Sequence, residues 1–334
     1  MIQVGVIGYG YWGPNLVRNF NSNGSSQVTM VCDRLPQSLE KVKKAYPRTK
    51  VTTDHNELIL DPDVDTVAIA TPVFTHYELA RKVLETGKSV FVEKPFTSTV
   101  AEAEELVELA EKKNLKIMVD HTFLYTGAVK KIKELMDGGV LGDLYYFDST
   151  RVNLGLFQHD VNVVWDLAPH DIAIMNYLIG KRPTGVVATG SGHFNRGMED
   201  IAYLTFFYPD NVIGHINVNW LSPVKVRSTL IGGMKKMLVW NDLESDEKIR
   251  VYDKGVDVKT TEGKYNLLIN YRSGDMWAPK IENTEALQLI AKHFADYVEH
   301  GGTIVNDGTA ALNVIRMLEA ASRSLRQKGE FVCL

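Results

Sequence analysis

The chain has 334 residues, of which 45% are apolar and 23% are charged, and its formal net charge is −4. This length favours two domains over one small core, and the slightly acidic balance excludes a general nucleic-acid surface, which needs clustered Lys and Arg. Because no run approaches ~18 apolar residues, the sequence also excludes a membrane-spanning helix.

The N-terminus and the cysteines bear on the cellular compartment. The opening residues MIQVGVIGYG lack the basic region and the cleavage site of a signal peptide. The two cysteines, Cys32 at the end of an apolar run and the penultimate Cys333, do not indicate a disulfide framework. We therefore expect a cytoplasmic protein.

Short apolar runs alternate with helix-like stretches over residues 1–122. The predicted strands are Gln3–Gly8, Val28–Cys32, Thr66–Ala70, Ser89–Val92 and Lys116–Val119. The predicted helices read PNLVRNFNS, SLEKVKKAY, HYELARKVLET and TVAEAEELVELAEKK, the last with a clear helical apolar period. Strand–helix alternation of this kind predicts a parallel sheet with helices on both faces.

A glycine-rich turn follows the first predicted strand. The stretch GVIGYGYWGPNL contains the pattern Gly8-x-Gly10-x-x-Gly13, and Pro14 suits the first turn of a helix. Between a strand and a helix, this pattern is typical of dinucleotide binding. Its glycines allow a tight turn, approach of the pyrophosphate to the backbone and close helix–sheet packing, and the helix N-terminus offers N–H groups to phosphates. The expected cofactor contacts here are Gly8, Gly10, Tyr11, Trp12 and Gly13.

Two residues at the end of the second predicted strand bear on the choice of cofactor. Asp33 lies 20 residues after Gly13, where a carboxylate accepts the adenosine ribose hydroxyls and repels a 2′-phosphate. This position favours NAD over NADP. The neighbouring Arg34 is the complication, because a guanidinium there could bind a phosphate or stack on adenine.

The pattern changes after residue 122, where strands dominate. A helix is predicted over Ala128–Met136, and most of Leu144–Tyr252 reads as strands, with two β-rich runs joined by a turn at Pro209–Asn211. Two helices, Glu285–His300 and Thr309–Gln327, close the chain. The predicted fold class is therefore α/β, with an N-terminal Rossmann domain at residues 1–122 and a C-terminal α+β domain with a large, mostly antiparallel open sheet at residues 123–334.

An acid and an imidazole lie four residues apart in VVWDLAPHDIAIMNYLIG, a helix that interrupts these strands. Proline is tolerated near a helix start, so Pro169 predicts a helix that begins near Trp165 or Asp166 and ends at Gly180. Asp166 and His170 then share one helix face. From the residues alone, the pair is a metal site, a proton-transfer pair or a structural contact with Asp166 as the helix cap.

Two further motifs stand at predicted strand ends. AIATPVFTHYELA places Thr71 and Pro72 at the end of a strand and His76 at the next helix start, and VFVEKPFT places the tripeptide Glu93–Pro95 at the next strand end. Open α/β sheets bind their ligands at the carboxyl ends of strands. Together with the glycine turn and the aspartate–histidine pair, these motifs resemble the Gfo/Idh/MocA (glucose–fructose oxidoreductase / inositol dehydrogenase) family over essentially the whole chain.

The resemblance implies a role for each matching residue. Lys94 corresponds to the lysine that lies beside the nicotinamide and hydrogen-bonds the reacting hydroxyl, and Asp166 and His170 correspond to the family's substrate-facing residues. Glu93 corresponds to a residue that borders the cofactor. The residues implied to line the adenosine and pyrophosphate side are Thr71, Pro72 and His76. In place of the family's common N-x-R-F type segment, this chain reads VDHTFLY, which puts Asp120 and His121 near the nicotinamide.

The chemistry of alcohol oxidation supports these assignments. A hydride leaves for the nicotinamide while the hydroxyl loses a proton, so a base must lie within hydrogen-bond reach of that hydroxyl. Histidine suits proton exchange near neutral pH, and we expect His170 to take this part with Asp166 orienting it. Lys94 is expected to stabilise the developing alkoxide.

A metal centre is not expected. Asp-x-x-x-His supplies two ligands where a catalytic zinc usually has three from the protein, and His121 or His159 would have to complete the site. The remaining candidates for substrate binding are Tyr125, Arg151 and Asn153. A further, lesser candidate is Trp220 in NVNWLS. An arginine at position 151 could clamp a carboxylate or diphosphate or could be an exposed strand residue.

The sequence therefore predicts an NAD-dependent dehydrogenase that acts on a secondary hydroxyl of a sugar. The segments GYWGPN and WDLAPHD look most like members that handle nucleotide-linked sugars, which implies C3 of a hexose such as a UDP-N-acetyl sugar. The alternatives are a free sugar or cyclitol as substrate, an enzyme that keeps its NAD bound, and a non-catalytic NAD-binding regulator. A second-domain sheet with one face free of helices predicts a homodimer or homotetramer.

Overall fold

A computed structural model describes residues 1–155, 161–194, 197–260 and 267–334. The chain divides into two compact units, one formed by Met1–Thr126 with Thr284–Glu319 and the other by Gly127–Asn283 with Ala320–Leu334. Each unit therefore combines segments that lie far apart in the sequence.

The first unit contains a six-stranded sheet in the order β3-β2-β1-β4-β5-β6, in which all neighbours run parallel. Its strands are β1 (Ile2–Ile7), β2 (Ser26–Cys32), β3 (Lys50–Thr52), β4 (Thr66–Ile69), β5 (Ser89–Val92) and β6 (Ile117–Val119). Its early helices are α1 (Gly13–Ser22), α2 (Pro36–Ala45), α3 (His55–Leu60), α4 (His76–Glu85) and α5 (Val100–Lys113), with one-turn helices η1 (Val73–Thr75) and η2 (Thr122–Tyr125). The parallel sheet with its helices confirms the predicted Rossmann fold.

Burial and capping explain why these elements form. β4 and β5 are buried at every position, as expected of parallel strands covered on both faces. α5 begins with a capping box, in which the Thr99 side chain accepts the N–H of Glu102 while the Glu102 carboxylate accepts the N–H of Thr99. It ends at Asn114 in the left-handed conformation.

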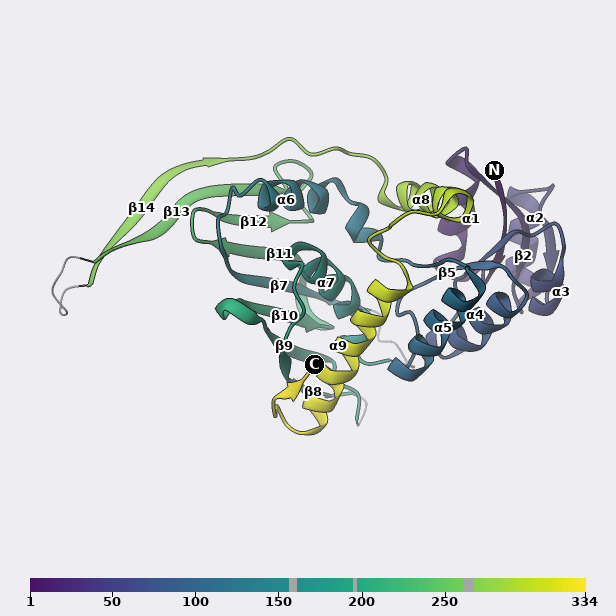
Figure 1. Cartoon of the computed structure of the whole chain (residues 1–334). Helices are drawn as coiled ribbons and strands as arrows, with labels where there is room; N and C mark the ends of the chain where they lie inside the picture. The colour runs from purple at the N-terminus through teal and green to yellow at the C-terminus, as the bar shows by residue number, and fades with distance from the viewer. Residues whose placement is uncertain (156–160, 195–196, 261–266) are drawn as a thin grey trace. The chain divides into compact units, whose positions relative to one another are not determined.

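A segment from the end of the chain completes the core of the first unit. α8 (Ala286–His300) lies alongside α1 (Figure 1), and Phe294 packs edge-to-face on Phe20 and Phe91, all three fully buried. The fully buried Asn306, just before α9 (Gly308–Arg326), donates from its side chain to the carbonyl of Val119 at 2.6 Å and accepts the Tyr125 hydroxyl at 2.8 Å. The segment Thr284–Glu319 is thus part of the first unit's core.

The second unit contains a nine-stranded sheet in the order β14-β13-β12-β11-β7-β10-β9-β8-β15. β10 runs parallel to β7 and the other neighbouring pairs are antiparallel, which confirms the predicted large, mostly antiparallel sheet. The strands are β7 (Leu144–Leu154), β8 (Gly185–Ser191), β9 (Ile201–Phe207), β10 (Ile213–Asn219), β11 (Leu221–Gly233), β12 (Met237–Asn241), β13 (Ile249–Thr260), β14 (Leu267–Trp277) and β15 (Val332–Cys333). The predicted turn between β9 and β10 is the one-turn helix η3 (Pro209–Asn211).

Together with the end of α9, the helices α6 (Gly127–Asp137) and α7 (Val163–Ile179) accompany this sheet, and α7 packs on β7, β9 and β10 (Figure 1). The predicted start of α7 near Trp165 or Asp166 is wrong, because the side chain of Asn162 caps the helix by accepting the N–H of Trp165 at 3.1 Å. Pro169 therefore lies inside the helix, and Asp166 is a first-turn residue rather than the cap. The predicted end at Gly180, in the left-handed conformation, is correct.

A bilayer-spanning helix is not found in the described part of the chain, since none of the helices there is long and apolar enough.

Candidate active site

The turn between β1 and α1 is too tight for side chains at two of its three glycines. Gly8 has a φ of 98°, and a Cβ on it would lie 2.5 Å from the carbonyl oxygen of Ala70. A Cβ on Gly13 would lie 2.3 Å from the carbonyl oxygen of Gly8, whereas a Cβ on Gly10 would meet nothing within 4 Å. The backbone at Gly10 is therefore open to a close ligand, as a bound pyrophosphate requires.

The start of α1 suits the phosphates of the same ligand. Trp12, the N-cap residue, contributes no side-chain hydrogen bond to the first turn. A phosphate can therefore accept from first-turn N–H groups and meet the positive end of the helix dipole. The rings of Tyr11 and Trp12 are exposed beside Gly10 in the sequence and pack edge-on, 5.7 Å apart.

The carboxylate of Asp33 is held in place at the end of β2. Its Oδ2 accepts the N–H of Tyr9 at 2.6 Å, and its Oδ1 accepts the N–H of Leu35 at 2.8 Å. The bond to Tyr9 ties the end of β2 to the glycine turn, so the carboxylate has a set orientation where a ribose is expected. Arg34 is exposed beside it.

His76 joins the loops that follow β4 and β5. It is 1% exposed, and its two ring nitrogens each lie 2.8 Å from a backbone carbonyl oxygen, Nδ1 from that of Pro95 and Nε2 from that of Thr71. The Lys94–Pro95 peptide bond is cis. His76 therefore links the two predicted cofactor loops through their backbone carbonyl groups, whereas Pro72 is exposed.

Lys94 follows β5 and is half-buried beside two carboxyl groups. Glu93 and Asp120 are 6% and 4% exposed and are hydrogen-bonded to each other. Burial and then the charge of Asp120 raise the pKa of Glu93 well above its ordinary value. Burial also raises the pKa of Asp120, although hydrogen bonds from Glu93 and Thr122 and the charge of Lys94 oppose that rise. Burial therefore disfavours two negative charges on this pair beside Lys94.

His121 lies in the same cluster and is neutral at pH 7. Burial, assisted by the charge of Lys94, lowers the pKa of its imidazole to about 4. Its two ring nitrogens are buried, and neither has a hydrogen-bond partner within the described residues. Buried polar atoms are normally paired, so this imidazole suits an uncharged polar group of a ligand.

Tyr125 is buried in the first unit by contacts to the returning segment. Besides the bond from its hydroxyl to Asn306, its ring meets that of His293 edge-on at 5.1 Å. The structure thus places its hydroxyl in a buried bond between η2 and the segment before α9. The predicted contact with substrate stays a prediction.

Asp166 and His170 lie one turn apart on the same face of α7. Asp166 stands in the first turn, where the helix dipole favours a carboxylate. Its Oδ2 accepts the indole N–H of Trp220 at 3.1 Å. Both Asp166 and His170 are half-buried, so each keeps a surface on which a ligand can bind.

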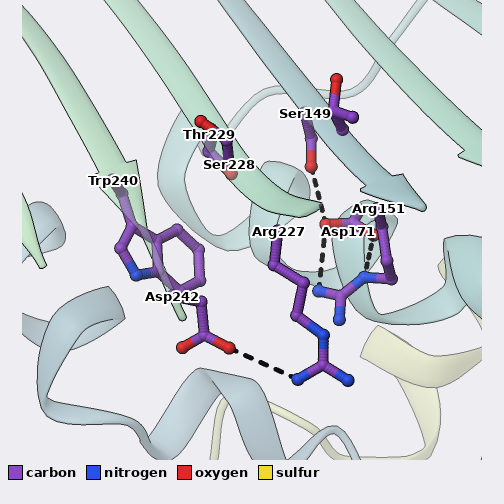
Figure 2. A pocket seen from close by; sticks show the side chains of 9 residues that line it. Ser149, Arg151, Asp171, Arg227, Ser228, Thr229, Trp240 and Asp242 are labelled. Carbon is purple, nitrogen blue, oxygen red and sulfur yellow. Dashed lines mark hydrogen bonds and ion pairs between the residues drawn. The ribbon is translucent and has the colours of Figure 1, made fainter. Parts of the chain in front are cut away.

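Arg151 forms a buried ion pair with the residue that follows His170. Its Nε and Nη2 lie 2.5 Å and 3.2 Å from the carboxylate oxygens of Asp171, which also accepts the Ser149 hydroxyl at 2.8 Å (Figure 2). The adjoining cavity has a volume of about 10 Å³, too small for a sugar ring. Arg151 thus joins β7 to α7, while Asn153 lies half-buried further along β7.

The described residues contain no group of three or more His, Cys, Asp or Glu side chains that could hold a metal ion. His159, one of the two histidines considered as a third ligand, lies outside the described residues.

Three contacts of these clusters were not predicted from the sequence. Asp171 offered a signal, because it is a charged residue in the otherwise apolar stretch that follows His170. The pairing of Glu93 with Asp120 joins the ends of neighbouring strands, and the bond from Trp220 joins the turn before β11 to Asp166 on α7, and neither gave a local signal.

Comparison with known proteins matches both units to one family. Residues 2–121 match the model described as "Oxidoreductase family, NAD-binding Rossmann fold", and residues 129–239 match the "GFO/IDH/MocA C-terminal domain". Together these matches cover more than half of the chain. The chain spans about half the length of the first curated relatives it matches, which are uncharacterised oxidoreductases.

Other similar proteins match along nearly the whole chain. The scyllo-inositol 2-dehydrogenase (NAD(+)) of Bacillus subtilis is 26% identical over 98% of this chain and 93% of its own. The structure of UDP-N-acetylglucosamine 3-dehydrogenase GnnA from Acidithiobacillus ferrooxidans has a TM-score of 0.80 at 21% identity, covering 98% of both chains. That of the WlbA dehydrogenase from Bordetella pertussis, in complex with NADH and UDP-GlcNAcA, has a TM-score of 0.81 at 17% identity over 100% of this chain and 98% of that one. At these identities the two structures share the fold.

The glycine turn gives a paired prediction. Gly13→Ala should lower stability by about 1–3 kcal/mol and weaken NAD binding, because its methyl group displaces the backbone at Gly8. Gly10→Ala should leave stability within ~0.5 kcal/mol yet weaken NAD binding at least about tenfold, because its methyl group fills the approach of the pyrophosphate. Chemical denaturation and calorimetric titration with NAD measure both effects. Unchanged NAD affinity in Gly10→Ala would contradict the assignment.

Proposed function

Because the chain belongs to the Gfo/Idh/MocA family of NAD-binding oxidoreductases, we propose that it is a dehydrogenase that oxidises a secondary hydroxyl of a sugar. The observation that carries this proposal is the set of residues at the carboxyl edge of the parallel sheet. There the open glycine turn after β1 and the half-buried Lys94 after β5 belong to the same edge. A cofactor loop and a cation at one sheet edge suit hydride transfer from an alcohol.

The first unit's residues would bind the cofactor and stabilise charge. NAD, held by the glycine turn and Asp33, supplies the hydride acceptor. Lys94 hydrogen-bonds the reacting hydroxyl, and its ammonium stabilises the oxygen as the proton leaves. Burial and the charge of Asp120 raise the pKa of Glu93, which disfavours a second negative charge beside Lys94.

The second unit's residues would accept the proton that the hydroxyl loses. His170 accepts the proton from the hydroxyl, and Asp166 orients the imidazole and accepts a substrate hydroxyl. Both belong to α7. The Asn162 cap fixes the start of this helix, and Arg151 holds Asp171, the residue that follows His170. A base on a helix held at these points keeps its direction, which proton transfer requires.

The proposed substrate is a nucleotide-linked hexose oxidised at C3, such as a UDP-N-acetyl sugar. Support comes from the segments GYWGPN and WDLAPHD and from the fold shared with UDP-N-acetylglucosamine 3-dehydrogenase. A cyclitol is the second candidate, since the scyllo-inositol 2-dehydrogenase is similar over nearly the whole chain. The set of Lys94, Asp166 and His170 favours an enzyme over a regulator, which has no need of a base.

We expect Lys94→Met to lower kcat by about a hundredfold to ten-thousandfold, because the reacting oxygen loses its cationic donor. NADH formation from UDP-N-acetylglucosamine, scyllo-inositol and myo-inositol measures the activity, and calorimetry should show retained NAD binding. Lys112→Met, an exposed change on α5, is the matched control and should keep wild-type turnover. Full activity in Lys94→Met would remove the core of the proposal.

NAD is the proposed cofactor, and Asp33 is the proposed cause of the preference. The wild type should show a higher kcat/KM with NAD than with NADP, because a carboxylate repels the 2′-phosphate. Asp33→Asn keeps an acceptor for the Tyr9 N–H and removes the charge, so the ratio should move toward NADP by about tenfold. A wild-type preference for NADP would overturn this assignment.

The expected homodimer or homotetramer is proposed on the outer face of the nine-stranded sheet. Tyr203, Phe207, Ile213 and Leu230 are exposed there, and Phe207 and Ile213 are directly paired across β9 and β10. Exposed apolar faces of this kind tend to be covered by another copy. Light scattering should give two or four times the 37.4 kDa chain mass, and Ile213→Asp should lower that mass. A single-chain mass for the wild type at micromolar concentration would disprove the assembly.

A further inference from the structure

The carboxylate of Asp166 is held by an indole from a different part of the fold. Trp220 is the one residue between β10 and β11, and it is 2% exposed. Its Nε1–H donates to Oδ2 of Asp166 at 3.1 Å, although 54 residues separate the two in sequence. A hydrogen bond to a carboxylate is stronger than one between neutral groups, and a packed ring holds its donor in one place.

Two adjacent residues, Glu199 and Asp200, hold both Trp220 and the start of α7. Asp200 accepts the backbone N–H of Trp220 at 2.9 Å through its carbonyl oxygen. The preceding carbonyl, of Glu199, accepts the N–H of Val163, the first residue of α7, at 3.0 Å. The Glu199 carboxylate also accepts the side-chain N–H of Asn162, the cap of α7, at 2.6 Å. The segment 199–200 therefore sets the indole and the helix that carries Asp166 in register with each other.

A carboxylate can rotate about its Cβ–Cγ bond, and a donor on one oxygen fixes the plane of both. With Oδ2 held by Trp220, Oδ1 keeps a constant direction relative to the face of α7 that carries His170. We propose that Trp220 is a positioning residue for the dehydrogenase reaction, which acts by fixing the orientation of the Asp166 carboxylate. This inference rests on the proposed function, since it matters only if Asp166 orients the base or the substrate.

The helix offers a matched comparison within the same turn. Trp165 is adjacent to Asp166, and its Nε1–H donates to the Ser322 hydroxyl at 2.9 Å. Trp165→Phe therefore removes an indole hydrogen bond of similar length from the same turn of α7 without removing the donor to Asp166. Trp220→Phe keeps an aromatic ring in the core and removes the donor.

The first experiment asks whether the bond exists, without reference to activity. Among the five tryptophans, the ¹⁵N-labelled indole signal of Trp220 is assigned as the one absent from Trp220→Phe. Asp166→Ala should shift this signal and speed its exchange with water, while the Trp165 signal keeps its position. An unshifted Trp220 signal overturns the proposal.

The second experiment measures turnover of UDP-N-acetylglucosamine and scyllo-inositol with NAD. Trp220→Phe should lower kcat about tenfold or more with unchanged KM for NAD and nearly unchanged melting temperature, while Trp165→Phe should keep wild-type kcat. An active wild type with undiminished kcat in Trp220→Phe overturns the positioning role and leaves the proposed function standing, as does an equal loss in both variants. An inactive wild type counts against the proposed function and against the positioning role with it.

Discussion

Parallel strands deliver all their carboxyl ends to one edge of a sheet, and the cofactor side of this protein depends on that constraint. The glycine turn follows β1, and four further residues follow β2, β4, β5 and β6, namely Asp33, Thr71, Lys94 and His121. Hydrogen bonds then join these loops, from Tyr9 to Asp33 and from His76 to the carbonyls of Thr71 and Pro95. These bonds hold the loops after β1 and β2 together, and likewise the loops after β4 and β5.

The fold was predictable where local sequence carries its own signal. Apolar runs gave the longer parallel strands, and the glycine pattern gave the start of α1, because strand burial and turn geometry are local properties. β3 was not predicted because its three residues, KVT, form no apolar run, and α3 was not predicted because six residues are too few for a visible helical period. The start of α7 lies earlier than Pro169 indicated, because the side chain of Asn162 caps the helix and Pro169 is accommodated inside it. The return of residues 284–319 to the first unit depends on distant contacts such as that of Phe294 with Phe20.

The candidate site, like the fold, has parts that the sequence predicted and parts that it did not. Strand-end motifs and one helix face pointed to Lys94, Asp166 and His170, and the family resemblance implied their roles, which stay predictions. The sequence did not show what holds them. Arg151 forms a buried ion pair with Asp171, and Glu93 is hydrogen-bonded to Asp120, and each pair joins two different elements of the fold. Such pairs depend on packing between elements, which local sequence patterns do not encode.

The two separate segments of the first unit also bear on how the chain folds during synthesis. A ribosome releases the N-terminal segment first, at about 5–20 residues per second, so the nascent Rossmann half exists for a time without residues 284–319. During that time Phe20 and Phe91 lack the ring of Phe294, and the Tyr125 hydroxyl lacks Asn306. The core of the first unit therefore closes only after β7 to β14 of the second unit have been translated, because residues 284–319 follow those strands in the chain.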